Sequence, residues 1–412
     1  MYKKKKLILM LLFISIALII GLSAIIFSKR NLASQQIDNT TLEIEELADD
    51  ELSQDDDPID EIEEESPSGE EPTEQTVVSY EDSPFELPVL GAGGYTSVET
   101  MLHASATKNS AVFDTLPAGT PFYVLEEQGN WWRIHTNNQE GWIDNSLVLV
   151  NLPDVIPSII YDNPNNYAST FRSSFMDIPG ITGEKLYEGH GYNERLGKEE
   201  FIMPIIYSTA KKIAEAQQAA LENNETLVVM ETFRPYSVQQ LVNEQLSALA
   251  EEDDNIRDGL TAEPWTMNWF INGGVSNHQR GLAVDVTLAS ISSMEDRIID
   301  NYIVPQITEY SVYEMYSPIF ELSTAAAMLI RPIAARDRVE WQDIPYQDHV
   351  NEEAIRLEAY MFEADMIPIA SEWWHFNDID VLEEFEEELG DGGFYLEMLL
   401  NQLPSMVEEA VE

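Results

Sequence analysis

The sequence predicts an α+β domain preceded by a small all-β barrel and an N-terminal transmembrane helix. Three observations predict this order. An uncharged, mostly apolar run of 21 residues covers 7–27, short apolar segments separated by turns cover 95–150, and helical patterns with a few separated strands cover 155–378. The last region has no Gly-rich nucleotide-binding loop, which agrees with an α+β domain.

The N-terminal apolar run is long enough to span a bilayer, and it follows a basic cluster, Lys3–Lys6, that favours a cytoplasmic N-terminus. The run exceeds the usual apolar core of a signal peptide, and its end has no clear small-x-small cleavage site. We therefore expect residues 1–30 to form a signal anchor in a single-pass protein of the cell membrane, with the rest of the chain outside the cytoplasm. The alternative is a cleaved signal, which would give a secreted protein.

Charge and cysteine content exclude several kinds of site. Residues 31–88 contain 21 Asp and Glu, no Lys or Arg and few aromatic residues, so we expect a disordered acidic linker there. The whole chain has a net charge of −53, which would repel phosphates and excludes nucleic acid as a partner. An acidic surface of this kind is the simple consequence of a salty or alkaline exterior. Because the chain has no cysteine, only His and carboxylate side chains remain as metal ligands.

The expected barrel combines a Leu-Pro-x-Gly-Thr turn at Leu116–Thr120 with short strands at 122–125, 131–134 and 141–143. This series, with its Gly-x-Trp-Trp and Gly-Trp-Ile strands, resembles bacterial SH3 domains, which commonly accompany enzymes that act on the cell wall. The resemblance implies an SH3-like domain at 89–151, joined to the next domain by a short Pro-containing linker. The alternative is that its tryptophans, Trp131 and Trp142, are only barrel core.

The region 155–378 has four recognisable elements. Apolar spacing predicts helices at 204–223 and 350–363, and a strand is expected at 226–230. The alternation of Leu282, Val284 and Val286 with polar or small residues predicts another strand, with Asp285 on one face. The residues after this region, 379–412, are acidic with scattered apolar positions, and we expect a helical extension to which no chemistry is assigned.

Two segments, 276–288 and 371–376, carry the residues with chemical potential. They contain His278, Asp285 and His375, which can close on one Zn²⁺ and leave the fourth coordination position for water. The remaining carboxylate, Glu372, would lie beside that water and take its proton. Each residue has a plainer interpretation, since a single His near a strand is usually structural and the pair Trp373–Trp374 is usually core or pocket wall.

The pattern Ser-x-His-x-x-Gly-x-Ala-x-Asp, followed by Glu-Trp-Trp-His, resembles the zinc D-alanyl-D-alanine dipeptidases of vancomycin resistance and the related D,D-carboxypeptidases. The resemblance covers 155–378 and implies a zinc metallopeptidase that hydrolyses D-Ala-D-Ala bonds in cell-wall-derived peptides. Its partners would be peptidoglycan stem peptides or the free dipeptide. The alternative is a catalytically inactive, peptidoglycan-binding wall protein built from the same folds.

The same resemblance implies further roles. Arg234 matches the Arg of the family's Tyr-Arg-Pro-type motif, with Phe233 in place of Tyr, and would stabilise charge on the scissile carbonyl. Ser276 matches a position near the bound substrate, and Arg280 is the next polar neighbour. The alternative for both residues is that they only stabilise the loop.

The dipeptidases have a Met-x-x-Pro-Phe-Asp-type segment whose Asp pairs with the ammonium of the dipeptide. Here Phe320 stands in the place of that Asp, although the adjacent Glu321 could substitute for it. Because a buried ammonium without its carboxylate would cost several kcal/mol, we expect D-Ala-D-Ala-ended stem peptides to be cleaved at least as well as the free dipeptide.

Overall fold

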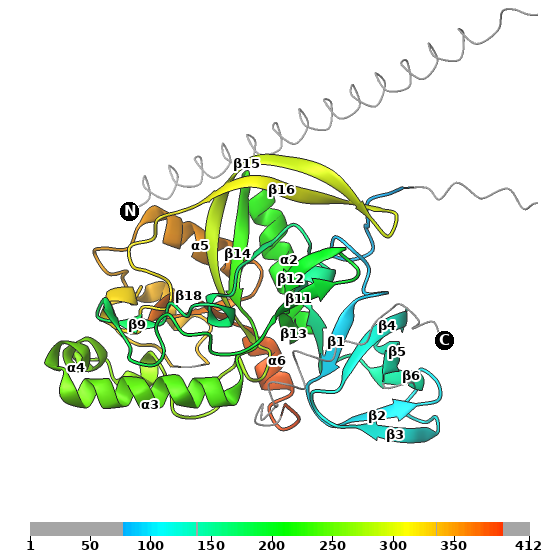
Figure 1. Cartoon of the computed structure of the whole chain (residues 1–412), viewed down its shortest axis with the longest axis horizontal. Helices are drawn as coiled ribbons and strands as arrows, with labels where there is room; N and C mark the ends of the chain where they lie inside the picture. The colour runs from blue at the N-terminus through cyan, green and yellow to red at the C-terminus, as the bar shows by residue number, and fades with distance from the viewer. Residues whose placement is uncertain (1–76, 137–138, 335, 390–412) are drawn as a thin grey trace, which may run out of the picture. The chain divides into compact units, whose positions relative to one another are not determined.

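The computed structural model describes residues 77–136, 139–334 and 336–389. Its first part, called the barrel below, is an all-β sheet in the region predicted to be SH3-like, and its first seven strands follow one another along the chain (Figure 1). Their bounds are β1 (Gly93–Thr96), β2 (Thr100–His103), β3 (Val112–Leu116), β4 (Pro121–Gln128), β5 (Trp131–Thr136), β6 (Gln139–Asp144) and β7 (Val148–Asn151). The three expected strands are confirmed as β4, β5 and β6. The fully buried tryptophan of the barrel is Trp132, whereas Trp131 and Trp142 are only half-buried.

An eighth strand, β13 (Pro204–Ile206), joins this sheet by pairing with β7. The helix expected from Pro204 therefore begins three residues later, as α2 (Tyr207–Leu221). Two consecutive β-branched residues, Ile205 and Ile206, are fully buried in the strand, which is the environment that such side chains favour. The residues that were expected to form a linker after β7 are also buried, so the barrel continues directly into the next part of the fold.

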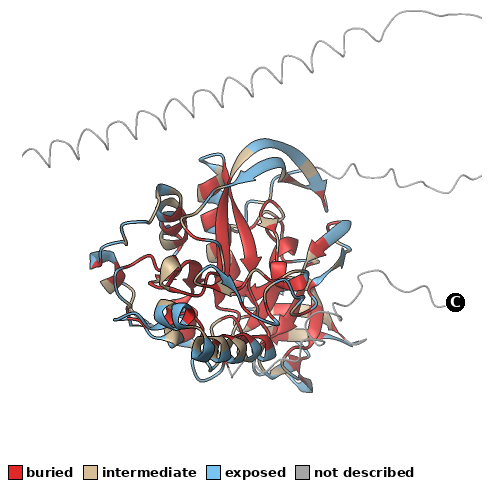
Figure 2. Ribbon diagram, turned by 60° about the vertical axis from the view of Figure 1, so that its left-hand side comes forward, coloured by how far each residue is buried: buried red, intermediate tan, exposed pale blue. Residues whose placement is uncertain are grey.

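The second sheet has the order β17-β18-β15-β14-β8, with β16 paired to β15. Its strands are β8 (Ile160–Tyr161), β14 (Glu225–Glu231), β15 (Ala283–Ile299), β16 (Tyr302–Val312), β17 (Ile367–Ile369) and β18 (Glu372–Asn377). β14 confirms the strand expected at 226–230. β15 confirms the strand around Asp285 but continues into a long hairpin with β16. Residues 292–296 of this hairpin are exposed and mostly polar, so they show no apolar alternation that would predict a strand. Figure 2 shows this sheet buried at its centre and exposed along the hairpin.

Helices cover the second sheet and flank the site. α2 and α5 (Glu352–Glu363) pack against each other and against strands of this sheet, and α5 confirms the helix expected at 350–363. The remaining helices are α3 (Tyr236–Glu252), α4 (Asp254–Thr261) and α6 (Ile379–Glu384). Two small hairpins complete the strands: β9 (Arg172–Ser173) with β10 (Met176–Asp177), and β11 (His190–Asn193) with β12 (Lys198–Phe201). The short 3₁₀ helices are Leu152–Asp154, Pro164–Asn166, Met267–Trp269, Thr324–Ala326 and Glu340–Asp343.

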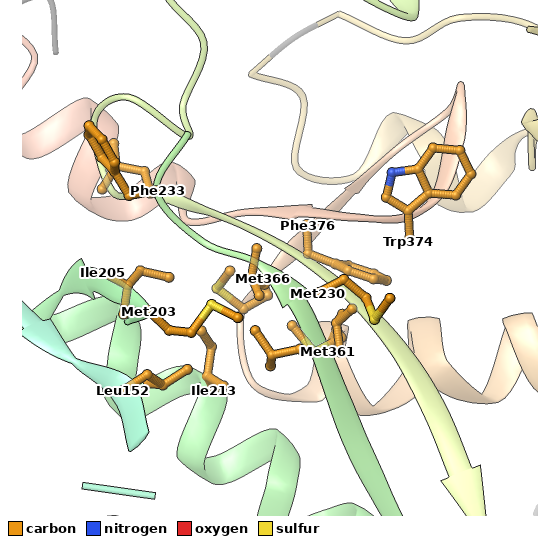
Figure 3. Close-up of a cluster of buried hydrophobic side chains, with 14 of the residues drawn as sticks. Leu152, Met203, Ile205, Ile213, Met230, Phe233, Met361, Met366, Trp374 and Phe376 are labelled. Atoms are coloured by element: carbon orange, nitrogen blue, oxygen red, sulfur yellow. The ribbon is translucent and has the colours of Figure 1, made fainter. Parts of the chain in front are cut away.

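One apolar core joins the barrel to the second sheet. Figure 3 shows side chains from the exit of the barrel, from β13, from α2 and from the second sheet gathered around β14. The residues labelled there are Leu152, Met203, Ile205, Ile213, Met230, Phe233, Met361, Met366, Trp374 and Phe376. Because this core is continuous, the barrel and the second sheet fold as parts of one packed unit.

The packed region begins earlier in the chain than the sequence predicted. Phe85 and Leu87 are buried although they belong to the segment expected to be a disordered linker. At the other end α6 packs into the same unit, and residues 390–412 of the expected extension lie outside the described residues. The predicted membrane segment, 7–27, also lies outside them. Within the described ranges no helix is both long and apolar enough to cross a membrane.

Candidate metal centre

Three side chains from separate parts of the chain converge at the second sheet. His278 lies in the turn before β15, Asp285 lies in β15, and His375 lies directly opposite Asp285 in the antiparallel strand β18. His278 Nε2 is 3.2 Å from Asp285 Oδ2 and 3.1 Å from His375 Nδ1, and His375 Nδ1 is 2.9 Å from Asp285 Oδ1. All three residues are buried. The structure therefore brings the three predicted ligands together.

The outer ring nitrogen of each histidine faces an oxygen. His278 Nδ1 is 2.6 Å from the carbonyl oxygen of Thr232, and His375 Nε2 is 3.1 Å from Asn377 Oδ1. A carbonyl or amide oxygen only accepts, so both outer nitrogens must carry the hydrogen. When both imidazoles are neutral, the inner nitrogens, Nε2 of His278 and Nδ1 of His375, therefore carry no hydrogen. Their lone pairs point at each other.

Electrostatics make this arrangement favourable only when positive charge is present. Although burial alone would raise the pKa of Asp285, its contacts with His278 and His375 hold that pKa well below the usual range. Burial alone would lower the pKa of His375, but the hydrogen bond that its ring donates to Asp285 raises it overall. Two facing electron pairs beside a carboxylate repel one another, so the centre attracts a proton or a metal cation.

The donor set and its spacing fit zinc. Two nitrogens and a carboxylate oxygen match the three protein ligands of catalytic zinc sites. Ligands at about 2.0–2.1 Å in a tetrahedral arrangement lie roughly 3.3 Å from one another. The three inner distances, between 2.9 and 3.2 Å, are close to that value.

Glu372 lies next to this centre because β18 is irregular. In a regular strand, residues three apart point to opposite faces. The register between β17 and β18 shifts between Pro368 and Ile369, so that Glu372 and His375 reach the same side. Glu372 Oε2 is 4.0 Å from His375 Nδ1. Burial, helped by Asp285, raises the pKa of Glu372 to about 8, and a cation at the centre would lower it.

Arg234 follows β14 and is held from three sides. Its Nε donates to Glu231 at 2.6 Å, Nη1 donates to Gln239 at 2.9 Å, and Nη2 donates to Asp285 at 3.1 Å, with Glu231 2.5 Å away from the same Nη2. A guanidinium has five N–H donors, so these four contacts leave one Nη1 hydrogen without a partner among the described residues. Arg234 therefore orients Asp285, a predicted ligand, and it has a spare donor while it lines the cavity.

The centre opens into a cavity of about 350 Å³, near the lower end of the roughly 300–1,000 Å³ that is usual for small-ligand sites. Its polar wall includes five of the predicted site residues, namely Arg234, Ser276, His278, Glu372 and His375. Other polar wall residues include Gln239, Asn277, Arg280, Arg336, Asp337 and Asn377, and apolar walls come from Phe171, Phe320, Ile333, Ile367, Trp374 and Leu382. Of the tryptophan pair, Trp374 lines this cavity, whereas Trp373 lines a second cavity with Met315 and Ser317.

The structure does not bring Glu321 to the cavity. Its carboxylate accepts hydrogen bonds from the backbone N–H of Phe175 at 3.0 Å and from the hydroxyl of Ser323 at 2.5 Å, and it is fully buried among them. Its neighbour Phe320 has a φ of 62° and turns its ring into the cavity wall. The expected replacement of the missing Asp by Glu321 is therefore wrong.

Several functional contacts were missed by sequence reasoning. Asn377 holds the outer nitrogen of His375 and is itself fixed by Asn277, whose amide donates to it at 2.8 Å. Its position two residues after His375 in a strand places it on the same face, which is a signal that could have found it. Glu231 and Gln239, which hold Arg234, have no comparable signal in the sequence.

Comparison with known proteins supports the barrel. Residues 100–148 match the family of bacterial SH3 domains, which confirms the SH3-like prediction for this part of the chain. No curated protein matches the sequence significantly. The family match ends before the second sheet, so the metal centre rests on the motifs and on its geometry.

Proposed function

We propose that this protein is a zinc peptidase that hydrolyses D-Ala-D-Ala bonds at the ends of cell-wall-derived peptides. The observation that carries the proposal is the centre formed by His278, Asp285 and His375, with both outer ring nitrogens held by oxygens and both inner nitrogens free to bind a cation. A zinc ion bound there would supply a Lewis acid and would lower the pKa of a water to about 7.

The chain's own residues would divide the work of amide hydrolysis. Glu372 lies beside the centre without being one of the three ligands, so it is the group that takes a proton from the attacking water. The water oxygen then forms its bond to the scissile carbonyl carbon, the C–N bond breaks, and Glu372 returns the proton to the departing nitrogen. The free Nη1 hydrogen of Arg234 is the donor for the carbonyl oxygen, where negative charge develops.

The substrate is proposed to be a stem peptide rather than the free dipeptide alone. Selection of a free dipeptide needs a carboxylate for its ammonium, and neither Phe320 nor Glu321 supplies one to the cavity. An SH3 domain beside the second sheet fits an enzyme that works on the cell wall, and the apolar run at 7–27 fits a membrane anchor with the enzyme outside the cytoplasm.

The rival function is a wall-binding protein without activity. The SH3 domain fits either function, but an inactive protein has no need for a complete ligand set, for Glu372 beside it and for Arg234 with a spare donor. We therefore favour the enzyme.

One experiment tests the proposal. The purified full-length protein, prepared without chelators, is assayed for bound metal by mass spectrometry and incubated with acetyl-L-Lys-D-Ala-D-Ala and with free D-Ala-D-Ala. About one zinc per chain and release of D-alanine from the longer peptide are expected, and the Glu372→Gln protein is the inactive control. Absence of bound metal after a gentle preparation, or absence of cleavage of both peptides, would sink the proposal.

A further inference from the structure

We infer that Arg280 is the carboxylate-binding residue of the cavity, so that the site takes peptides with a free C-terminus and releases a single terminal residue. This inference rests on the proposed peptidase function and names the group by which that site would recognise its substrate.

The first observation is that Arg280 has no ion-pair partner among the described residues. Within the part of the chain that the structure describes, nine of the eleven arginines have a carboxylate within 4.0 Å. The two exceptions are Arg280 and Arg297. Arg297 lies on the β15–β16 hairpin and donates to a backbone carbonyl. Arg280, in contrast, is a half-buried wall residue of the cavity. In a chain with 75 acidic residues, a cation without a carboxylate at such a place is available to a ligand.

The second observation concerns the other charges around Arg280. Arg336 also lines the cavity, but Glu386 binds both ends of its guanidinium, so its charge is already compensated. Burial first, and then Arg336, lower the pKa of Arg280, while Glu386 acts in the opposite direction. Asp337, a carboxylate that also lines the cavity, has no ion pair with Arg280 within 4.0 Å, and its Oδ1 accepts the backbone N–H of Val339 at 2.8 Å.

The third observation is that Arg280 is connected to the metal centre. Its Nη1 donates to Asn277 Oδ1 at 3.2 Å, and the amide of Asn277 donates to Asn377, which holds the outer nitrogen of His375. One hydrogen bond leaves most of the guanidinium fork free, and a fork of this geometry binds a carboxylate through two parallel hydrogen bonds.

The chemistry of the ligand follows from the walls. A free carboxylate would meet Arg280, and a small apolar side chain such as that of alanine would meet Ile333, Ile367 and Leu382. The carboxylate belongs to the leaving residue, so the reaction breaks the last peptide bond and not one inside a longer chain. A peptide whose C-terminus is blocked would lose its main electrostatic contact.

The test compares acetyl-L-Lys-D-Ala-D-Ala with its C-terminal amide. Dissociation constants are measured with the full-length Glu372→Gln protein loaded with zinc, so that turnover does not interfere. We expect the free acid to bind about 10- to 100-fold more tightly than the amide. Adding Arg280→Gln should remove this preference, whereas adding Arg257→Gln should leave it intact, since Arg257 lies on α4 and pairs with Asp254. Arg280→Lys, which keeps the charge without the planar fork, should retain a smaller preference.

The outcomes separate the two proposals. No preference for the acid in the protein with Arg280 intact overturns the inference, and this measurement needs no folded Arg280 variant. A preference that survives in a zinc-loaded Arg280→Gln protein also overturns it. If the unsubstituted protein binds the acid selectively but does not hydrolyse it, the inference about Arg280 stands and the proposed function fails. If it hydrolyses the acid and the amide equally, the proposed function stands and the inference fails.

Discussion

Gly281 lies directly against Leu149 of the SH3 barrel. A Cβ at Gly281 would be 2.3 Å from Leu149 Cδ2, and the φ of Gly281 is +69°. The carbonyl of Gly281 accepts the backbone N–H of Ile206, which belongs to the strand that pairs with β7. Since Gly281 closes the turn that begins at His278, the barrel supports the loop that carries this proposed metal ligand.

The first prediction concerns this contact. Gly281→Ala should lower the free energy of unfolding by more than the roughly 1–2 kcal/mol of left-handed backbone strain, because the new methyl group also collides with Leu149. Gly129→Ala is the matched control, since Gly129 has a φ of +58° and no atom within 4 Å of its would-be Cβ. Thermal or urea unfolding of both variants measures the difference. Equal losses in the two would mean that the barrel contact is unimportant.

The second prediction concerns the ligands. His278→Ala, Asp285→Ala and His375→Ala should each lose zinc and activity together, because each removes one of three protein ligands. The exposed His190, on β11, provides a control substitution that should keep both. The zinc content of each variant is measured by mass spectrometry. Full zinc occupancy in one variant would remove the substituted residue from the ligand set.

The third prediction concerns the residue behind a ligand. Asn377→Ala removes the acceptor that holds the outer nitrogen of His375, so zinc affinity should fall about 10- to 100-fold while the three ligands remain. Competition with a chromogenic chelator measures this affinity. Asn223→Ala, at an exposed asparagine after α2, is the control. An unchanged affinity for Asn377→Ala would show that His375 is oriented by other contacts.

The fourth prediction separates the base from the ligands. Glu372→Gln should keep zinc and lose about 10²- to 10⁴-fold in kcat, because an amide cannot accept the proton of water. Glu363→Gln, at an exposed position at the end of α5, should behave like the unsubstituted protein. Full activity of Glu372→Gln would show that another group acts as the base.

The fifth prediction concerns stability and pH. Burial raises the pKa of Glu358 to about 7, although the hydrogen bond from Tyr346 opposes this. The folded state therefore holds the proton more tightly than the unfolded state, and this contribution to stability is complete below the unfolded pKa of 4.5 and is lost as pH rises through about 7. Its size is roughly 3 kcal/mol.

Denaturation of Glu358→Gln between pH 4 and pH 8 checks this. An amide cannot ionise, so the unfolding free energy of the variant should fall less with rising pH than that of the unsubstituted protein. Glu363→Gln should follow the unsubstituted curve, because Glu363 is exposed. Parallel curves for Glu358→Gln and the unsubstituted protein would contradict the prediction.

Local patterns were sufficient for several of the elements and for proposing the residue types of the site. The turn at Leu116–Thr120 and the strands after it predicted the SH3 barrel, and apolar spacing predicted β14 and α5. The predicted ligand set could be chosen because the segments around His278 and His375 match the two halves of one motif, in a chain that has six histidines and no cysteine. Such features depend on side-chain chemistry and on periodicity over a few residues, which a sequence records directly.

Tertiary structure decided everything that depends on pairing between distant segments. The register that sets Asp285 opposite His375, the irregularity that turns Glu372 to the same side, and the strand at Pro204–Ile206 all arise from hydrogen bonds to strands far away in the chain. The same holds for the charges: Arg234 is compensated by Glu231 and Asp285, and Glu321 is buried away from the cavity. A side chain's partners, and therefore its charge state and its availability to a ligand, are set by which segments the core brings together.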